Sequence, residues 1–370
     1  GCTPRTVSVL ALLVTPPDRS VNFPVVGDRA WYTKEKLALY TLGMIAIAVT
    51  IPARNRKALT CNILSQLYQQ AATLRDLDLT AIVVDDGSTD GTPEAIRHRF
   101  PQACLLLGDG SLWWGGATAK AMQYALDRLE FDYILWVNDD VILDDRFLEN
   151  VKEVCSDPNY ENAIVSGIVR DTRYPDWIVF SGLAGGRPVR SLEAFGEAEF
   201  LEAEQVAGNI TLIPKAVLEK AGLPDTDWLP HYSDYEYCLR SRFKFGFRVL
   251  ISRKLQARTD YEFYSEFIRH SPAWLQWYLE RGSDRRREIL QGFHETKVHY
   301  NIEHQVKMRH WWTRDIPEWK YWFYYTKQVL QLWAIDLLPP IAMKRRVLDY
   351  ARTENVPQEY VNKILPLRGQ

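Results

Sequence analysis

From Ile45 onward the sequence alternates short apolar strands with amphipathic helices, and this alternation constrains the fold more than any other feature. Strands are expected at 45–49, 80–84, 103–107 and 133–137, with helices over 58–71, from Thr92 onward and over 118–129. Such an alternation is typical of an α/β domain with a mostly parallel sheet flanked by helices.

Beyond residue 140 the alternation loosens. Further strands are expected at 163–169, 177–180, 209–213 and 247–251, helices at 214–221 and 234–245, and a Gly/Arg-rich loop at 182–190. Past residue 254 only helical, aromatic and charged segments follow. We therefore predict an α/β domain over 44–255 and an α-helical C-terminal extension over 256–370. Met44 directly precedes the first strong strand, so residues 1–43 are expected to be a dispensable N-terminal leader.

Charge is unevenly distributed along the 370 residues, although the net charge is only −2. Residues 252–370 carry 20 Lys and Arg against 14 Asp and Glu, whereas residues 1–251 carry 25 against 33. The near-neutral total argues against a nucleic-acid partner. The basic, aromatic C-terminal region fits either peripheral contact with an anionic membrane or a homodimer interface.

The cysteines and the apolar runs bear on the cellular compartment. The five cysteines are widely spaced and form no CxxC pair, as in reduced cytoplasmic proteins. No apolar run reaches the roughly 18 residues of a membrane-spanning helix. We expect a cytoplasmic protein, bound to the inner face of the cytoplasmic membrane if its C-terminal region contacts lipid.

Two expected strands end in paired carboxylates, Asp85-Asp86 and Asp139-Asp140. Asp is also an ordinary turn and helix-capping residue, which accounts for one such pair. Two pairs at the carboxyl edge of one sheet, where α/β proteins bind ligands, are harder to explain in that way. Clustered carboxylates repel one another, so they need a cation or hydrogen-bond donors. Mg²⁺ or Mn²⁺ with a phosphate-bearing substrate suits such oxygen ligands.

Five segments in order resemble glycosyltransferase family 2, whose members have the GT-A fold. Residues 83–92 (VVDDGSTDGT) resemble its nucleotide-binding signature, and Asn138-Asp139-Asp140 its DxD-type metal motif. Residues 52–56 (PARNR) are similar to its opening loop. Residues 208–214 (GNITLIP) and 233–240 (SDYEYCLR) resemble its acceptor-side strand and catalytic-base helix. The resemblance spans roughly residues 45–251.

The resemblance implies a role for each matching residue. Asp85, beside Asp86, would accept a hydrogen bond from the pyrimidine N3–H of the nucleotide. Asp234 would be the general base of an inverting transfer, with Glu236 as a secondary candidate. Because a helix is expected to start at Asp234, we predict that the helix dipole lowers the pKa of this carboxyl. The loop residues Pro52, Arg54, Asn55 and Arg56 would support the base and ribose, and the metal ligands would be Asp140 with Asn138 or Asp139.

Residues 108–118 (GDGSLWWGGAT) and 231–236 (HYSDYE) resemble rhamnosyltransferase-like members. The resemblance implies dTDP-L-rhamnose as donor and a glycan or lipid-linked glycan acceptor in surface polysaccharide synthesis. Tryptophan faces suit the methyl of a deoxy sugar, although both tryptophans could instead be core residues. Some members recruit a late histidine as a further metal ligand, which here would be His270 or His294. The expected donor-sugar and acceptor residues are Trp113, Trp114, Gly115, Gly116, Asn209, His231 and Tyr232.

Three alternatives remain open at this stage. One is a family 2 transferase that uses a UDP-hexose. Another is a nucleotidyltransferase, but residues 51–56 lack the glycines that its loop requires. The third is a non-catalytic nucleotide-sugar-binding or scaffold relative, in which Ala119 replaces the Asn of many relatives. Retention of Asp85, Asp140 and Asp234 argues against that third alternative.

Overall fold

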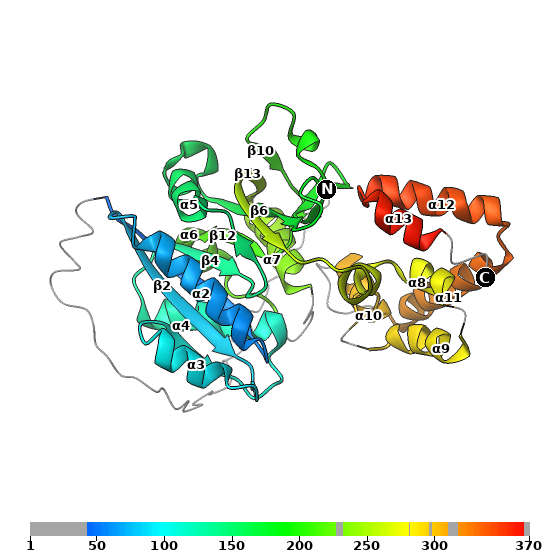
Figure 1. Ribbon diagram of the computed structural model, residues 1–370, viewed down its shortest axis with the longest axis horizontal. Helices are drawn as coiled ribbons and strands as arrows, with labels where there is room; N and C mark the ends of the chain where they lie inside the picture. Colours follow the sequence, from blue (N-terminus) through cyan, green and yellow to red (C-terminus); the bar gives the residue numbers. More distant parts are fainter. Residues whose placement is uncertain (1–42, 227–231, 281, 296–297, 310–316, 366–370) are drawn as a thin grey trace, which may run out of the picture. The chain divides into compact units, whose positions relative to one another are not determined.

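The computed structural model describes residues 43–226, 232–280, 282–295, 298–309 and 317–365. The predicted leader, residues 1–43, lies almost wholly outside the described residues. Figure 1 shows a central sheet followed along the chain by a set of helices. The strands are β1 (Ile45–Ala53), β2 (Leu77–Asp85), β3 (Cys104–Leu107), β4 (Tyr133–Val137), β5 (Ile142–Leu143), β6 (Ala163–Asp171), β7 (Ile178–Phe180), β8 (Gly182–Ala184), β9 (Arg187–Pro188), β10 (Phe200–Glu202), β11 (Gln205–Val206), β12 (Ile210–Pro214) and β13 (Arg248–Thr259).

Helices connect these strands and then form the C-terminal region. In the first part of the chain they are α2 (Lys57–Ala71), α3 (Thr92–Arg99), α4 (Trp113–Arg128), α5 (Phe147–Ser156), α6 (Lys215–Ala221) and α7 (Ser233–Phe245). After β13 come α8 (Ala273–Leu279), α9 (Ser283–Gly292), α10 (Ile302–Arg309), α11 (Glu318–Leu337), α12 (Pro340–Thr353) and α13 (Gln358–Ile364).

The main sheet has the strand order β10-β13-β6-β12-β4-β1-β2-β3. Strands β3, β2, β1 and β4 are parallel, whereas β12 runs antiparallel to both β4 and β6. The sheet is therefore mixed beyond β4, and the predicted α/β fold class with a C-terminal helical region is confirmed.

Successive side chains of each strand point to opposite faces of the sheet, so they pack into two apolar cores, one on each face. Val49, Val83 and Leu135 join the core that holds α2 and α5. Ile82 and Trp136 join the core that holds α4, α6 and α7. The first core continues through the C-terminal region, where it includes Leu275, Leu332 and Tyr360.

Three elements differ from the sequence-based expectation. Helix α4 begins at Trp113, five residues before the predicted start. Strand β13 continues to Thr259, because its second half pairs with β6 and β5 after a bulge. The predicted loop at 182–190 contains β8 and β9, which form a small sheet with β11. Within the described residues, no helix is both long enough and apolar enough to cross a membrane.

Candidate functional site

The candidate site lies where the parallel strands end. Ala53 pairs with Asp85 and Asp85 with Leu107, so β1, β2 and β3 end at one level. On the other side of β1, the backbone N–H of Asn138, which follows β4, donates to the carbonyl of Asn209 at 2.9 Å. The sheet thus brings the predicted nucleotide, metal and acceptor segments to a single edge.

The loop between β1 and α2 organises this edge. Asn55 adopts a φ of +52°, and its side-chain oxygen accepts from the backbone N–H of Thr89 at 2.7 Å. Arg54 donates to the carbonyl of Gly110 at 2.6 Å, which ties the loop to the segment before α4. Pro52 lies half-buried in β1. Three segments of the predicted nucleotide site therefore contact one another.

Asp85, the last residue of β2, is 1% exposed and has one oxygen without a partner. Its Oδ1 accepts from the backbone N–H of Ser88 at 2.9 Å, whereas Oδ2 has no hydrogen bond in the structure. A buried carboxylate oxygen without a donor is costly. Such an atom fits a site that is completed by an N–H group of a ligand.

Asp86 has a different environment, because both of its oxygens are used by the protein. They accept from the backbone N–H groups of Gly110 at 2.8 Å and Trp113 at 3.1 Å. Trp113 has a φ of +59°, which is unusual for a bulky side chain. Asp86 therefore fixes the start of α4, and Gly115 and Gly116 lie in the first turn of this helix instead of in a loop.

The two carboxylates after β4 share one cation, Arg56. Its Nη1 lies 2.9 Å from Oδ1 of Asp139 and 2.8 Å from Oδ2 of Asp140. Thr60 also donates to Asp139, at 3.2 Å. Burial raises the pKa of Asp139 to about 6, against the opposing influence of Arg56. Arg56 is predicted to lie at the nucleotide base and ribose, and in the structure its guanidinium pairs with both carboxylates of the predicted metal motif.

The carboxylate oxygens of this motif suit a metal ion that takes only some of its ligands from the protein. Within the described part of the chain, no group of three His, Cys, Asp or Glu side chains is placed to hold a metal. Asp140 is about one-third exposed, and Asp139 is buried beside it. Mg²⁺ commonly binds through one or two carboxylates, with substrate phosphates and water as its other ligands. Asp140, with Asp139 behind it, matches that pattern.

Trp114 connects the metal motif to the predicted base. Its indole N–H donates to Oδ1 of Asn138 at 2.8 Å, and its ring packs edge-on against Trp136 at 5.3 Å between centroids. A Cβ atom on Gly208 would lie 2.4 Å from Cζ2 of Trp114, so only glycine fits there. The N–H of Gly208 in turn donates to Oδ2 of Asp234 at 2.9 Å.

Asp234 is the second residue of α7, and the predicted lowering of its pKa is wrong. Burial raises the pKa of Asp234 to about 6, and hydrogen bonds from the backbone N–H groups of Gly208 and Tyr235 only partly oppose that rise. The helix N-terminus does not offset the loss of water. A carboxylate with a pKa near neutrality is well suited to accept a proton.

Glu236 faces a different neighbour. It is 3% exposed and lies 2.6 Å from Nε of Arg240, whose guanidinium also donates to the carbonyl of Leu223. This contact gives Glu236 a structural partner in the interior of the domain. The geometry therefore favours Asp234 over Glu236 as the group that meets an acceptor.

Tyr232 and His270 bring the C-terminal region to this edge. The hydroxyl of Tyr232 donates to the carbonyl of His299. His270 stacks on Tyr261 at 6.1 Å between centroids, and the charge of Asp140 is among the influences on its pKa, which burial lowers. His294 contacts Tyr321 of α11 instead. His231 lies outside the described residues.

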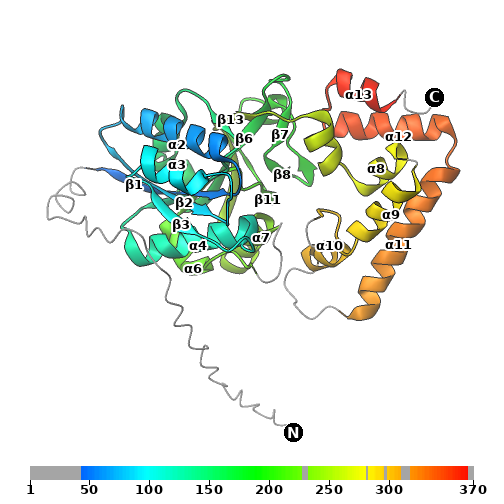
Figure 2. The same cartoon turned by 60° about the horizontal axis from the view of Figure 1, so that its bottom comes forward.

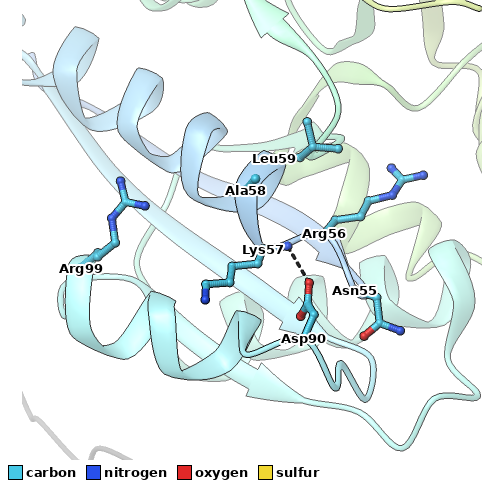
Figure 3. A pocket seen from close by; sticks show the side chains of 7 residues that line it. All are labelled: Asn55, Arg56, Lys57, Ala58, Leu59, Asp90 and Arg99. Atoms are coloured by element: carbon cyan, nitrogen blue, oxygen red, sulfur yellow. Dashed lines mark hydrogen bonds between the residues drawn. The ribbon is translucent and has the colours of Figure 1, made fainter.

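An open pocket of about 570 Å³ lies beside the start of α2, and Figure 3 shows the side chains that line it. Asp90 accepts from the backbone N–H of Lys57 there, and Arg56 extends away from Lys57. None of Asp85, Asp140 or Asp234 lines this pocket, so we do not place the donor in it. Its lining residues are Asn55, Arg56, Lys57, Ala58, Leu59, Asp90 and Arg99.

Two residues that support the site, Thr60 and Gly208, were not among the site residues predicted from the sequence. Thr60 supports Asp139 from the first turn of α2, and Gly208 holds Asp234 while admitting the ring of Trp114. A polar residue one turn into α2 carries no distinguishing signal in the sequence. Gly208 could have been identified, because a glycine directly before a buried strand often marks a close approach of another group.

Residues 48–192 match the model of Glycosyl transferase family 2. This match confirms the family resemblance for the part of the chain that carries β1 to β9 and the acidic pairs. The chain matches no curated protein.

Similar solved structures include two glycosyltransferases. One is the mannosyltransferase PcManGT from Pyrobaculum calidifontis in complex with GDP-Man and Mn²⁺, with 17% identity, a TM-score of 0.47, and coverage of 87% of this chain and 85% of that one. The other is S. aureus TarS 1-349 in complex with UDP, with 15% identity, a TM-score of 0.44, and coverage of 87% and 90%.

Proposed function

We propose that this protein is a metal-dependent, inverting glycosyltransferase that moves a sugar from a pyrimidine nucleoside diphosphate to a glycan or lipid-linked glycan. The observation that carries the proposal is the unpartnered, buried Oδ2 of Asp85 inside the region that matches family 2. The imide N3–H of uracil or thymine supplies the one donor that this oxygen lacks. Guanine offers two adjacent N–H donors, but Oδ1 of Asp85 already accepts from Ser88.

The rest of the edge supports the transfer step. Asp234 accepts the proton of the acceptor hydroxyl while that oxygen bonds to the anomeric carbon. The bond from that carbon to the diphosphate oxygen breaks on the opposite face, which inverts the configuration. Asp140, with Asp139, would hold a divalent metal, and the metal would stabilise charge on the departing diphosphate. A base with a pKa of about 6 is mostly ionised at pH 7 and still basic enough for this task.

We propose dTDP-L-rhamnose as the donor, with Trp113 and Trp114 near the sugar. The resemblance of residues 108–118 to rhamnosyltransferase-like proteins supports this choice. Both tryptophans are half-buried at the start of α4, on the same edge as Asp234. A UDP-hexose is the alternative donor, since the contacts of Asp85 suit uracil and thymine equally.

A thermal-shift screen tests the donor site. We expect dTDP or UDP with Mn²⁺ to raise the melting temperature, GDP to raise it much less, and Asp85→Ala to abolish the rise. A ligand at 100 times its Kd adds about 2.7 kcal/mol to stability, which is readily measured. Glu219→Ala, an exposed carboxylate change on α6, is the matched control. No shift with any pyrimidine diphosphate would contradict the proposal.

An assay of sugar transfer distinguishes a glycosyltransferase from a non-catalytic relative that only binds the nucleotide sugar. We expect inverted product from dTDP-L-rhamnose and a glycan acceptor, lost in Asp234→Asn. Turnover with a UDP-hexose alone would overturn the rhamnose assignment but keep the transferase. Nucleotide binding with neither transfer nor donor hydrolysis would favour the scaffold alternative.

A further inference from the structure

Helix α11 carries an apolar face that the described protein leaves uncovered. The side chains of this face lie three or four residues apart, so they line one side of the helix. Thr326 is the polar residue among them. We call the following residues the α11 stripe: Trp319 (65% exposed), Trp322 (50%), Phe323 (58%), Leu330 (63%), Trp333 (57%) and Leu337 (86%).

The opposite side of α11 is already occupied by protein. Leu332 and Ile335 are each 1% exposed, and Tyr321, Tyr325 and Val329 pack against the core. Helix α11 packs on α8 and α10, and Figure 2 shows it beside these helices. The helix is therefore apolar on both sides, whereas an ordinary surface helix is polar on its outer side.

Cations lie next to this stripe. Lys327 is exposed on α11, and the next helix, α12, carries the exposed Ile341 (79%) one turn before Lys344 and Arg345. A hollow there is lined by Ile341, Lys344, Arg345, Leu348, Asp349 and Arg352. The hollow holds three cations and one carboxylate, Asp349, which pairs with Arg352 at 3.1 Å and more distantly with Arg345 at 3.9 Å. The end of the stripe is thus positively charged.

We infer that the α11 stripe and the first turns of α12 form a docking surface for an anionic lipid bilayer. Tryptophan prefers the boundary between lipid and water, and the stripe carries three. The 20 residues of α11 span about 30 Å, long enough to lie along a leaflet with the cations at the level of the headgroups. The docking would also hold the protein at the membrane that carries a lipid-linked acceptor, and that part alone rests on the proposed function.

Charge favours lipid over a second copy of this chain. The cations beside the stripe are Lys327, Lys344 and Arg345, and across a two-fold axis through the middle of α11 Lys327 would approach its own copy. Anionic headgroups instead attract each of these residues. Because exposed cations are screened by salt, docking should weaken as ionic strength rises.

Co-sedimentation of the full chain with vesicles tests the inference. We expect binding to phosphatidylcholine vesicles that contain about 30% phosphatidylglycerol, and much weaker binding to pure phosphatidylcholine. The double variant Leu330→Glu/Leu337→Glu should reduce binding at least about tenfold. Lys344→Glu/Arg345→Glu should remove the preference for phosphatidylglycerol. Phe243→Glu changes a similarly exposed side chain on α7 and should bind like the unmodified protein.

Other outcomes would overturn the inference. They are no binding of the unmodified protein, equal binding of the Leu330→Glu/Leu337→Glu variant, or a dimer in solution that this variant dissociates without any vesicle binding. Thermal shifts with dTDP, UDP and Mn²⁺ are measured on the same variants. An unchanged nucleotide shift beside failed docking would leave the proposed function intact.

Discussion

Asp234 combines two properties that oppose each other. Its partial burial near Tyr232, Tyr235 and Cys238 raises its pKa to about 6, which suits the proposed role as a base. The same burial makes the ionised carboxylate unfavourable in the folded protein. Because the folded pKa exceeds that of the unfolded chain, Asp234 lowers stability as the pH rises from about 4 to about 6.

We therefore expect Asp234→Asn to abolish transfer. The same change should stabilise the protein at pH 7, raising its free energy of unfolding by an amount on the order of 2 kcal/mol or less. Asn retains an oxygen that can accept from Gly208. The advantage should vanish near pH 4, where the native carboxyl is protonated. Thermal melts of both proteins from pH 4 to 8 measure this, and a variant that is less stable at every pH would contradict it. In the unmodified protein, kcat/KM for the proposed transfer should fall below about pH 6.

Gly208 has no room for a side chain, because the ring of Trp114 packs directly against it. Gly208→Ala places a Cβ within 2.5 Å of two ring carbons of Trp114, so the ring must move away from Asn138. We expect a loss of about 1–3 kcal/mol in the free energy of unfolding and a lower kcat. Gly282→Ala, at a glycine with open space around it, should cost less than about 1 kcal/mol.

A double-mutant cycle separates this packing effect from a backbone effect. Trp114→Phe removes part of the ring that the new methyl would meet, so Gly208→Ala should cost less in that background. Urea denaturation of the four proteins gives the coupling. Additive costs would mean that the ring does not account for the requirement for glycine.

At the scale of elements, Tyr360 is the buried side chain of α13 that packs against the sheet domain, and Glu359 of the same helix accepts from the hydroxyl of Tyr174. Tyr360 is fully buried, and its hydroxyl donates to the carbonyl of Tyr261 at 2.8 Å. Its ring packs against Trp177 at 5.6 Å between centroids, and the indole N–H of Trp177 donates to the carbonyl of Glu354. The C-terminal helices thus contact the segment between β6 and β7.

We predict that Tyr360→Phe costs about 1–3 kcal/mol, because the hydroxyl donates to Tyr261 and accepts from the guanidinium of Arg173, and that Tyr360→Ala costs about 3–5 kcal/mol. Urea denaturation followed by tryptophan fluorescence measures both costs. A loss confined to a separate, early transition in Tyr360→Ala would mean that the helical region unfolds independently, in line with the predicted boundary near residue 255. A single shifted transition would mean that the two regions unfold together.

The elements show which parts of the fold a sequence can predict. Strand β4 occupies the predicted residues 133–137, because a very apolar run between turn residues has few alternatives. The start of α4 was missed, since Gly115 and Gly116 disfavour helix and tertiary contacts from Asp86 override that preference. The Arg56–Asp139 pair was also missed, because its partners are 83 residues apart and no local pattern joins them.

At the scale of the whole molecule, ligand binding should determine how stability responds to metal. Arg56 already neutralises Asp139 and Asp140, and the described residues hold no three-ligand cluster. Mn²⁺ alone should therefore bind weakly, and EDTA should leave the melting temperature of the nucleotide-free protein unchanged. With dTDP or UDP present, the diphosphate supplies the missing ligands, so Mn²⁺ should add a stabilisation that EDTA removes.

Arg56→Ala sharpens this prediction, because it removes the cation that competes with metal. The two carboxylates would then repel each other, and we expect the variant to be less stable without metal by about 1–3 kcal/mol. We expect Mn²⁺ alone to raise the melting temperature of this variant and to change that of the unmodified protein very little. Calorimetric titration of both proteins with Mn²⁺ compares the affinities directly. If Arg56→Ala bound Mn²⁺ no better than the unmodified protein, the carboxylates after β4 would not be the metal ligands, and the effect of Mn²⁺ on nucleotide binding would have to arise elsewhere at this edge.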